Sequence, residues 1–126
     1  MASESVDLIY LDPPFNSNRA YNIIYPNDMG QVTAFDDTWS WTPQCDEYLQ
    51  EMKAQNSRQS LDAFNILNAL ISAMDKIQIN AYLVNMAIRL LEMHRILKST
   101  GSIYLHCDPT ASHYLKILMD RIFGQE

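Results

Sequence analysis

The sequence predicts an α/β fold in which two parallel strands are joined by a long helical crossover and followed by a C-terminal helix. Two apolar segments, Val6–Leu11 and Ser102–Asp108, predict the strands, and each of them is followed by proline. The chain between them carries apolar residues at helical spacing. A strand, a helical excursion and a second strand form a right-handed crossover, so both strands should end at the same edge of the sheet.

Length and composition indicate one globular domain. The chain has 126 residues, of which 48% are hydrophobic, and a net charge of -6. This charge has the wrong sign for a module that holds nucleic acid by phosphate neutralisation alone. No apolar run has membrane-spanning length, and no signal-peptide pattern opens the chain, so we expect a cytoplasmic protein. Cys45 and Cys107 lack metal-binding spacing, and we expect free, inert thiols.

The first strand leads into a rigid tip. Leu8, Ile9, Tyr10 and Leu11 form a continuous apolar run, which predicts a strand buried on both faces. Pro13 and Pro14 supply no amide hydrogen and therefore stop the strand in a stiff extended turn. That turn presents Asp12 and Phe15 beyond the carboxyl end of the strand, where open α/β sheets bind their ligands.

A polar loop and an irregular stretch follow the tip. Arg19, in the loop 16–22, could reach a phosphate or a carboxylate, or it could be a solvated surface arginine. We expect residues 23–41 to be irregular, with rings such as Trp41 fixing them to the body. Asp36 and Asp37 invite a metal or acid–base interpretation, but no third ligand stands at a suitable spacing, so we expect them to face solvent and predict no metal site.

Helices should occupy the rest of the chain. Thr42 and Pro43 predict a capped helix start, with a helical pattern to about Met74 that breaks near residues 56–57. A helix over about 80–97 is apolar around most of its circumference and should be deeply buried, with Gly101 in a left-handed turn after it. A last helix should cover about 113–123, capped by Thr110 or Ser112.

An acid and a histidine lie close together near the end of the 80–97 helix. Glu92 and His94 are two residues apart and so do not face each other, which makes a catalytic pair a poor interpretation. We expect these side chains and Arg95 to be surface groups of the last helical turn.

The residues of the tip are suited to bind an exocyclic amine. Asp12 could accept one hydrogen of an exocyclic amine on a planar heterocycle, the Pro13 carbonyl could accept the other, and Phe15 could stack on the ring. These hydrogen bonds would make the amine a better nucleophile toward an electrophilic methyl group. A base inside duplex DNA reaches such a pocket only after it has been rotated out of the stack.

Residues Asp12-Pro13-Pro14-Phe15 resemble the Asp-Pro-Pro-aromatic motif of the amino-methyltransferases that modify adenine N6 or cytosine N4 in DNA with S-adenosylmethionine. Residues 16–18, 35–39 and 91–110 are similar to the corresponding segments of beta-type, restriction-modification members of that family. The resemblance implies a partial Rossmann-like methyltransferase fold. It implies catalytic roles for Asp12, Pro13, Pro14 and Phe15, cofactor contacts from Asp12, Pro13 and Asn16, and nucleic-acid contacts from Phe15, Asn18 and Arg19. An acid at position 12 favours adenine N6 over cytosine N4.

The chain also departs from that family. It contains only Gly30, Gly101 and Gly124, so it lacks the Phe-x-Gly-x-Gly loop for the methionine end of the cofactor, and it lacks a target-recognition domain. We therefore expect residues 1–126 to be a single partial catalytic domain. The isolated chain should be inactive, and the full-length enzyme, prokaryotic or from a phage, should act on double-stranded DNA.

Exposed strand edges of such a segment should favour self-association. Two other interpretations remain open. One is a non-catalytic remnant or interaction module that binds a partner chain through an open sheet edge. The other is a ligand-binding α/β domain in which the motif is accidental.

Overall fold

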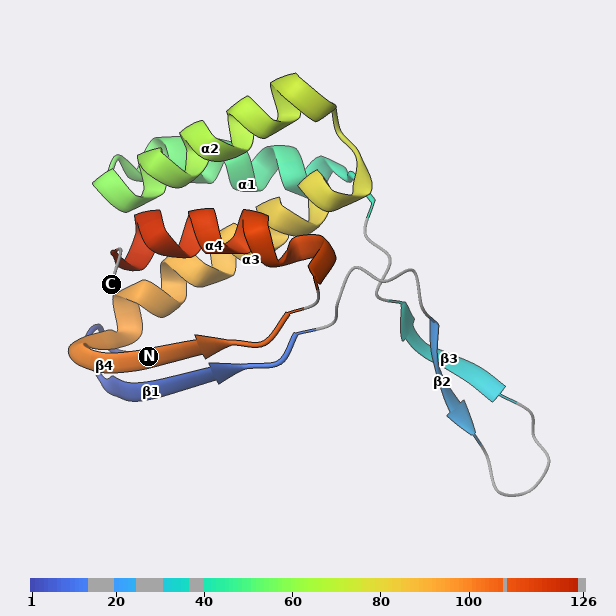
Figure 1. The fold of residues 1–126 in the computed structure, drawn as a ribbon, viewed down its shortest axis with the longest axis horizontal. Helices are drawn as coiled ribbons and strands as arrows, with labels where there is room; N and C mark the ends of the chain where they lie inside the picture. The colour runs from blue at the N-terminus through green and yellow to red at the C-terminus, as the bar shows by residue number, and fades with distance from the viewer. Residues whose placement is uncertain (14–19, 25–30, 37–39, 108, 125–126) are drawn as a thin grey trace.

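The computed structural model of the chain describes residues 1–13, 20–24, 31–36, 40–107 and 109–124, with the backbone alone considered for 20–24 and 31–36. Figure 1 shows the helices on one side of a small sheet, and a hairpin that projects beyond the carboxyl end of that sheet. In chain order the elements are β1 (Val6–Leu11), β2 (Ala20–Ile24), β3 (Gln31–Asp36), α1 (Pro43–Gln55), α2 (Arg58–Met74), α3 (Gln78–Ile96), β4 (Leu97–Leu105) and α4 (Pro109–Phe123).

The two predicted strands pair in parallel, which confirms the central expectation. β1 and β4 form a two-stranded sheet in which Ile9 lies opposite Ile103, Tyr10 opposite Tyr104 and Leu11 opposite Leu105. The helices α1, α2 and α3 form the crossover between them. Both strands therefore end at the same edge of the sheet.

Two local predictions were wrong: that the second strand begins at Ser102, and that Gly101 lies in a left-handed turn before it. β4 follows α3 directly at Leu97, and Gly101 lies within the strand instead of in a left-handed turn after the helix. A Cβ atom at position 101 would lie 2.7 Å from the Leu97 Cδ1 atom and 2.9 Å from the Asp7 carbonyl oxygen. Glycine is required here because β1 and the Leu97 side chain come so close.

The stretch predicted to be irregular contains a hairpin. β2 and β3 pair antiparallel, with Tyr21 opposite Phe35 and Ile23 opposite Val32. Aromatic and β-branched residues favour strands, and the prediction gave them too little weight beside the turn-forming residues 26–30. Trp41, beyond the hairpin, is half-buried and donates its indole N–H to Asp46 at 3.2 Å, as expected of a ring that fixes this stretch to the body.

The predicted break in the helical region separates α1 from α2. Asn56 ends α1 in the left-handed conformation (φ 56°), and Ser57 begins α2 by accepting a hydrogen bond from the Ser60 amide at 3.1 Å. The Ser60 hydroxyl donates to the Met52 carbonyl at 2.5 Å inside the core, which holds the two helices together. Thr42 stands at the N-cap of α1 as predicted, but its side chain makes no capping hydrogen bond.

The core lies within the helical layer, and α3 is its centre, as predicted. The side chains of α3 that are shielded from solvent are Asn80, Ala81, Tyr82, Leu83, Val84, Met86, Ala87 and Leu90. From α4, Leu115, Leu118 and Ile122 complete this core. The predicted start of α4 was wrong: the helix begins at Pro109, so Thr110 and Ser112 lie inside it. Proline is well suited to the first turn of a helix, because its missing amide would have no intrahelical partner there.

Only one face of the β1–β4 sheet is covered, so the prediction of a strand buried on both faces was wrong. Leu11, Ile103 and Leu105 are partly buried and pack against the helical core, and Ile9 on the same face is also partly buried. The alternate residues Leu8, Tyr10 and Tyr104 are 60%, 68% and 58% exposed. All the helices that the structure describes lie on the same side of the sheet (Figure 1), which leaves the second face open.

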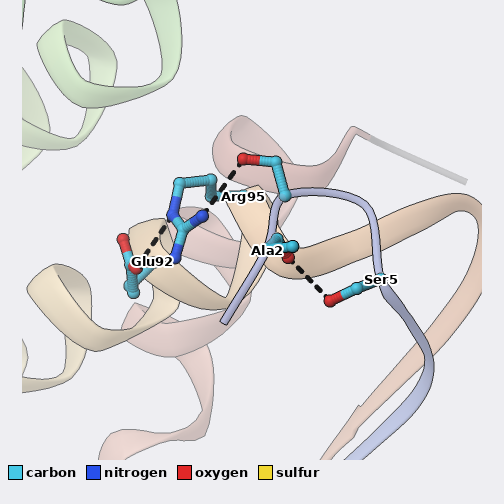
Figure 2. A network of polar contacts seen from close by, with 5 residues as sticks. Ala2, Ser5, Glu92 and Arg95 are labelled. Atoms are coloured by element: carbon cyan, nitrogen blue, oxygen red, sulfur yellow. Dashed lines mark hydrogen bonds and ion pairs between the residues drawn. The ribbon is translucent and has the colours of Figure 1, made fainter.

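The amino end of the sheet is tied to the end of α3. The amides of Glu4 and Ser5 donate to the carbonyls of Arg95 and Ile96 at 3.0 and 2.8 Å. Figure 2 shows the Arg95 guanidinium between Glu92 and the N-terminal segment, where it also donates to the Ser3 hydroxyl at 3.1 Å. These contacts fix where β1 begins, and therefore where its carboxyl end lies.

Candidate functional site

Asp12 and Pro13 lie at the carboxyl end of β1. At this end of the sheet, the His106 amide donates a hydrogen bond to the Leu11 carbonyl at 2.9 Å. Asp12 is exposed and Pro13 is half-buried, so the carboxylate is accessible at the edge of the sheet. The prediction that this residue stands beyond the carboxyl end of a parallel strand is confirmed.

His106 and Cys107 lie at the same edge, and sequence reasoning gave them no role in the site. Because Leu11 pairs with Leu105, the next positions along the two strands are Asp12 and His106. His106 is exposed, whereas Cys107 is half-buried, packs against the core and is not part of a disulfide. The signal that points to them is the parallel register, because two parallel strands that end together bring their following residues together.

The other predicted site residues lie outside the described part of the chain. These are Pro14, Phe15, Asn16, Asn18 and Arg19. Asp37, which was predicted to face solvent, and Asp108, at the end of the second predicted strand, also lie outside it. Their roles therefore stay predictions. Within the described residues, no group of three or more His, Cys, Asp or Glu side chains could hold a metal ion.

Glu92 and Arg95 are exposed, as predicted, whereas His94, also predicted to be a surface group, is half-buried. The Arg95 Nε atom donates to the Glu92 carboxylate at 2.8 Å, and this hydrogen bond lowers the pKa of Glu92 and raises the pKa of Arg95. The His94 ring contacts the edge of the Phe123 ring, with centroids 5.4 Å apart. Each polar group thus has a structural partner, and the cluster lies at the amino end of the sheet, away from Asp12.

A groove of about 680 Å³ opens on the helical layer between α1, the start of α2 and α3. Its walls mix opposite charges, including Glu51, Arg89 and the Glu92–Arg95 ion pair, around Tyr48 and Leu91. Asp12 does not line this groove. Since its charges balance one another and no group in it is set apart chemically, we assign it no catalytic role.

Comparison with known proteins identifies the family. Residues 6–126 match the family model of the N6/N4 methyltransferases, described as DNA methylase. The chain belongs to the DNA methylase family. The match spans both strands, so the Asp12 edge lies within the methylase sequence, and the interpretation of the motif as accidental was wrong.

One curated relative shows where such a methylase segment occurs. The chain is 31% identical over 123 residues to the Mod subunit of the type III restriction-modification enzyme StyLTI from Salmonella typhimurium strain LT2. This alignment covers 98% of the chain but 16% of the relative. No solved structure gives a significant match to this methylase segment. No helix among the described residues is long and apolar enough to cross a membrane.

Proposed function

We propose that this chain is the catalytic-strand segment of a site-specific DNA methyltransferase that acts on the exocyclic amine of a flipped base, with adenine N6 favoured. The observation that carries this proposal is the accessible Asp12 carboxylate at the carboxyl end of a parallel strand, in a chain of the DNA methylase family. Double-stranded DNA is the proposed substrate of the full-length enzyme.

The proposed chemistry at this edge requires two acceptors held in place. Asp12 would accept one amine hydrogen and the Pro13 carbonyl the other, while Phe15 would stack on the base. Hydrogen bonds to both amine hydrogens draw the nitrogen lone pair out of conjugation with the ring, which makes it available for attack on a methyl group. The β1–β4 hydrogen bonds and the N-terminal contacts with Arg95 keep the acceptors in place.

S-adenosylmethionine is the proposed methyl donor, and it supplies an electrophilic methyl group when bound. The glycines that the structure describes do not form a binding loop for S-adenosylmethionine at the Asp12 edge. Gly101 packs against Leu97 early in β4, and Gly124 follows α4. We propose instead that binding of the cofactor needs groups beyond these 126 residues, so that the isolated chain transfers no methyl groups.

A chimaera tests the proposed function. The matched segment of the StyLTI Mod subunit would be replaced by this chain, and methyl incorporation into DNA would be measured alongside the parent subunit. We expect an active chimaera to lose about a hundredfold or more of its activity in Asp12→Ala, since the amine loses a charged acceptor. Nucleoside analysis of the product then separates N6-methyladenine from N4-methylcytosine.

Two controls keep this experiment interpretable. Leu8→Ala, on the open face of the same strand, should leave the activity of the chimaera within a few-fold of its starting value. If Asp12→Ala retained full activity in a chimaera that methylates DNA, the assignment of the amine-holding role to Asp12 would be wrong.

A second candidate function is an interaction module that binds a partner chain through a sheet edge. It is favoured by one observation: within the described residues, each strand of the β1–β4 sheet has a hydrogen-bonded neighbour on one side only. Calorimetric titration of the chain with S-adenosylmethionine and with its demethylated product bears on both functions. Binding of either compound supports a partial enzyme and contradicts the interaction module, whereas the absence of binding by a folded chain agrees with a remnant and also with an incomplete catalytic segment.

The same free edges support a proposal of self-association, since an unpaired strand edge is a template for another strand. Sedimentation of the purified chain over a range of concentrations tests it. A clean monomer at every concentration, with a cooperative melt, would contradict self-association.

A further inference from the structure

His106 follows β4 and lies beside Asp12 at the carboxyl end of the sheet. Leu11 pairs with Leu105, and the His106 amide donates to the Leu11 carbonyl at 2.9 Å, so the parallel pairing continues to the residues that follow the two strands. We infer that His106 is a positioning residue of the proposed amine site, whose imidazole N–H holds the Asp12 carboxylate in the orientation that accepts an amine hydrogen. This inference rests on the proposed function, which names Asp12 but not the group that orients it.

The register brings the two side chains to the same side of the sheet. Successive side chains of a strand point to opposite faces, and directly paired residues of neighbouring strands point to the same face. Leu11 and Leu105 pack against the helical core, so Asp12 and His106, the next residue on each chain, both point away from it. Neighbouring strands lie about 4.8 Å apart, which places the imidazole within reach of the carboxylate.

The pairing of β1 with β4 fixes the backbone next to Asp12 but not the rotation of its side chain. The carboxyl plane turns easily about the last bond of the side chain. An acceptor that must meet one amine hydrogen needs a second contact to hold that plane. Hydrogen bonds of this kind are often long or poorly aligned until the substrate is bound, so we expect the contact between His106 and Asp12 to tighten in the complex with DNA.

The chemistry of the imidazole suits this role. Among the described residues at the two strand ends, 11–13 and 105–107, His106 has the only side chain with an N–H donor. An ionised carboxylate accepts several hydrogen bonds on its two oxygens, so it can bind the amine and the imidazole together. A hydrogen bond to a charged acceptor is roughly twice as strong as a neutral one. With one oxygen held by His106, the other stays directed at the amine.

Variants of the chimaera with the StyLTI Mod subunit test whether an N–H donor is needed at position 106. His106→Leu removes the donor, and turnover should fall about tenfold while KM for DNA stays within a few-fold, because a misplaced acceptor slows the chemical step. His106→Asn and His106→Gln present an amide N–H near the positions of the imidazole Nδ1 and Nε2 atoms. One of these two variants should restore most of the turnover, and its identity shows which nitrogen donates.

A double variant separates positioning from an independent role. If His106 acts by orienting Asp12, His106→Leu should cause no further loss in the Asp12→Ala background, because the group that it orients is already absent. Ser102→Ala is the matched control, since Ser102 lies on the same side of β4 about 13 Å before His106, and it should leave turnover unchanged. Thermal melting establishes that each variant folds.

NMR spectroscopy of the chain itself tests the placement without any methyl transfer. We expect nuclear Overhauser contacts between the ring protons of His106 and the side-chain protons of Asp12, because the two residues are neighbours on one face. Tyr10 and Tyr104, which pair directly in the same register, give the reference contact. A folded chain that shows the tyrosine contact but lacks the contact between His106 and Asp12 would overturn the inference, whether or not the chimaera is active.

The turnover measurements distinguish failure of this inference from failure of the proposed function. If Asp12→Ala loses activity and His106→Leu does not, His106 has no part in the site, while the role of Asp12 stands. If both amide variants are as slow as His106→Leu, or if His106→Leu costs as much in the Asp12→Ala background, His106 does not act as a donor to Asp12 and the inference is wrong. Full activity of Asp12→Ala would instead overturn the proposed function, and the inference with it.

Discussion

The helix α3 and the strand β1 are both rich in large apolar residues, but they differ in what surrounds them. Both contain runs of large apolar residues, yet Leu83, Val84 and Leu90 of α3 are fully buried while Leu8 and Tyr10 of β1 are more than half exposed. α3 is surrounded by α1, α2 and α4, whereas β1 has helices on one side only. An apolar run therefore contributes to stability where other elements cover it, and its uncovered residues contribute little.

The largest effect on stability should come from the core helix. Leu90→Ala should lower the free energy of unfolding by about 2–5 kcal/mol, because it leaves a cavity among packed side chains. Leu8→Ala, at an exposed position, should lower it by less than about 1 kcal/mol. Urea titration of both variants measures the difference. Equal losses would show that the open face is covered in solution.

A smaller effect is expected where β1 approaches the start of β4. Gly101→Ala should destabilise the chain by about 1–3 kcal/mol, since its methyl group would meet the Asp7 carbonyl and the Leu97 side chain at 2.9 and 2.7 Å. Thermal unfolding measures this. A neutral result would mean that the two strands separate easily at their amino ends, and the fixed position of β1 would then need another explanation.

The cap of α2 should have a still smaller effect. Ser57→Ala removes the acceptor of the Ser60 amide and should cost about 1 kcal/mol, whereas Ser57→Asp should retain most of the stability. Comparison of the two variants by urea titration isolates the cap from any loss of packing. If both variants behaved alike, the hydrogen bond to Ser60 would not be the reason for the effect.

The weakest expected effect is the pH dependence of the Glu92–Arg95 pair, which is exposed to solvent. The hydrogen bond from Arg95 holds the pKa of Glu92 below the ordinary value of a glutamate, 4.5. A carboxyl whose pKa is lower in the folded state stabilises the fold above pH 4.5, and this contribution is lost as the pH falls through the lowered pKa. The difference in stability between wild type and Glu92→Gln should therefore shrink from about pH 6 to about pH 3.5. A difference that grows on acidification would contradict the lowered pKa.

Local patterns were sufficient to predict most elements of the helical layer. The break near Asn56 and Ser57, the buried circumference of α3 and the apolar face of α4 all follow from the spacing of apolar residues and from helix-ending residues. Helix boundaries were less predictable, because Pro109 can begin a helix as well as close a strand. The β2–β3 hairpin was missed because its strand-forming residues are interspersed with turn-forming ones.

The candidate site was predictable in part. The position of Asp12 follows from an apolar strand stopped by two prolines, and the family follows from the motif and its neighbouring segments. The presence of His106 and Cys107 at the same edge depends on the parallel register, which joins residues more than ninety positions apart in the chain. That both strands end at one edge follows from the predicted crossover, but no local pattern gives the residue-by-residue register that sets His106 beside Asp12.

The sequence by itself determined the family, the order of strands and helices in the crossover, and the rigid tip at Asp12 and Pro13, because each depends on residues that are adjacent or periodically spaced. Only the tertiary structure decided which face of the β1–β4 sheet is covered. Leu8 and Ile9 are equally apolar, and their different exposure arises because the helices of the crossover and α4 all pack against the same side.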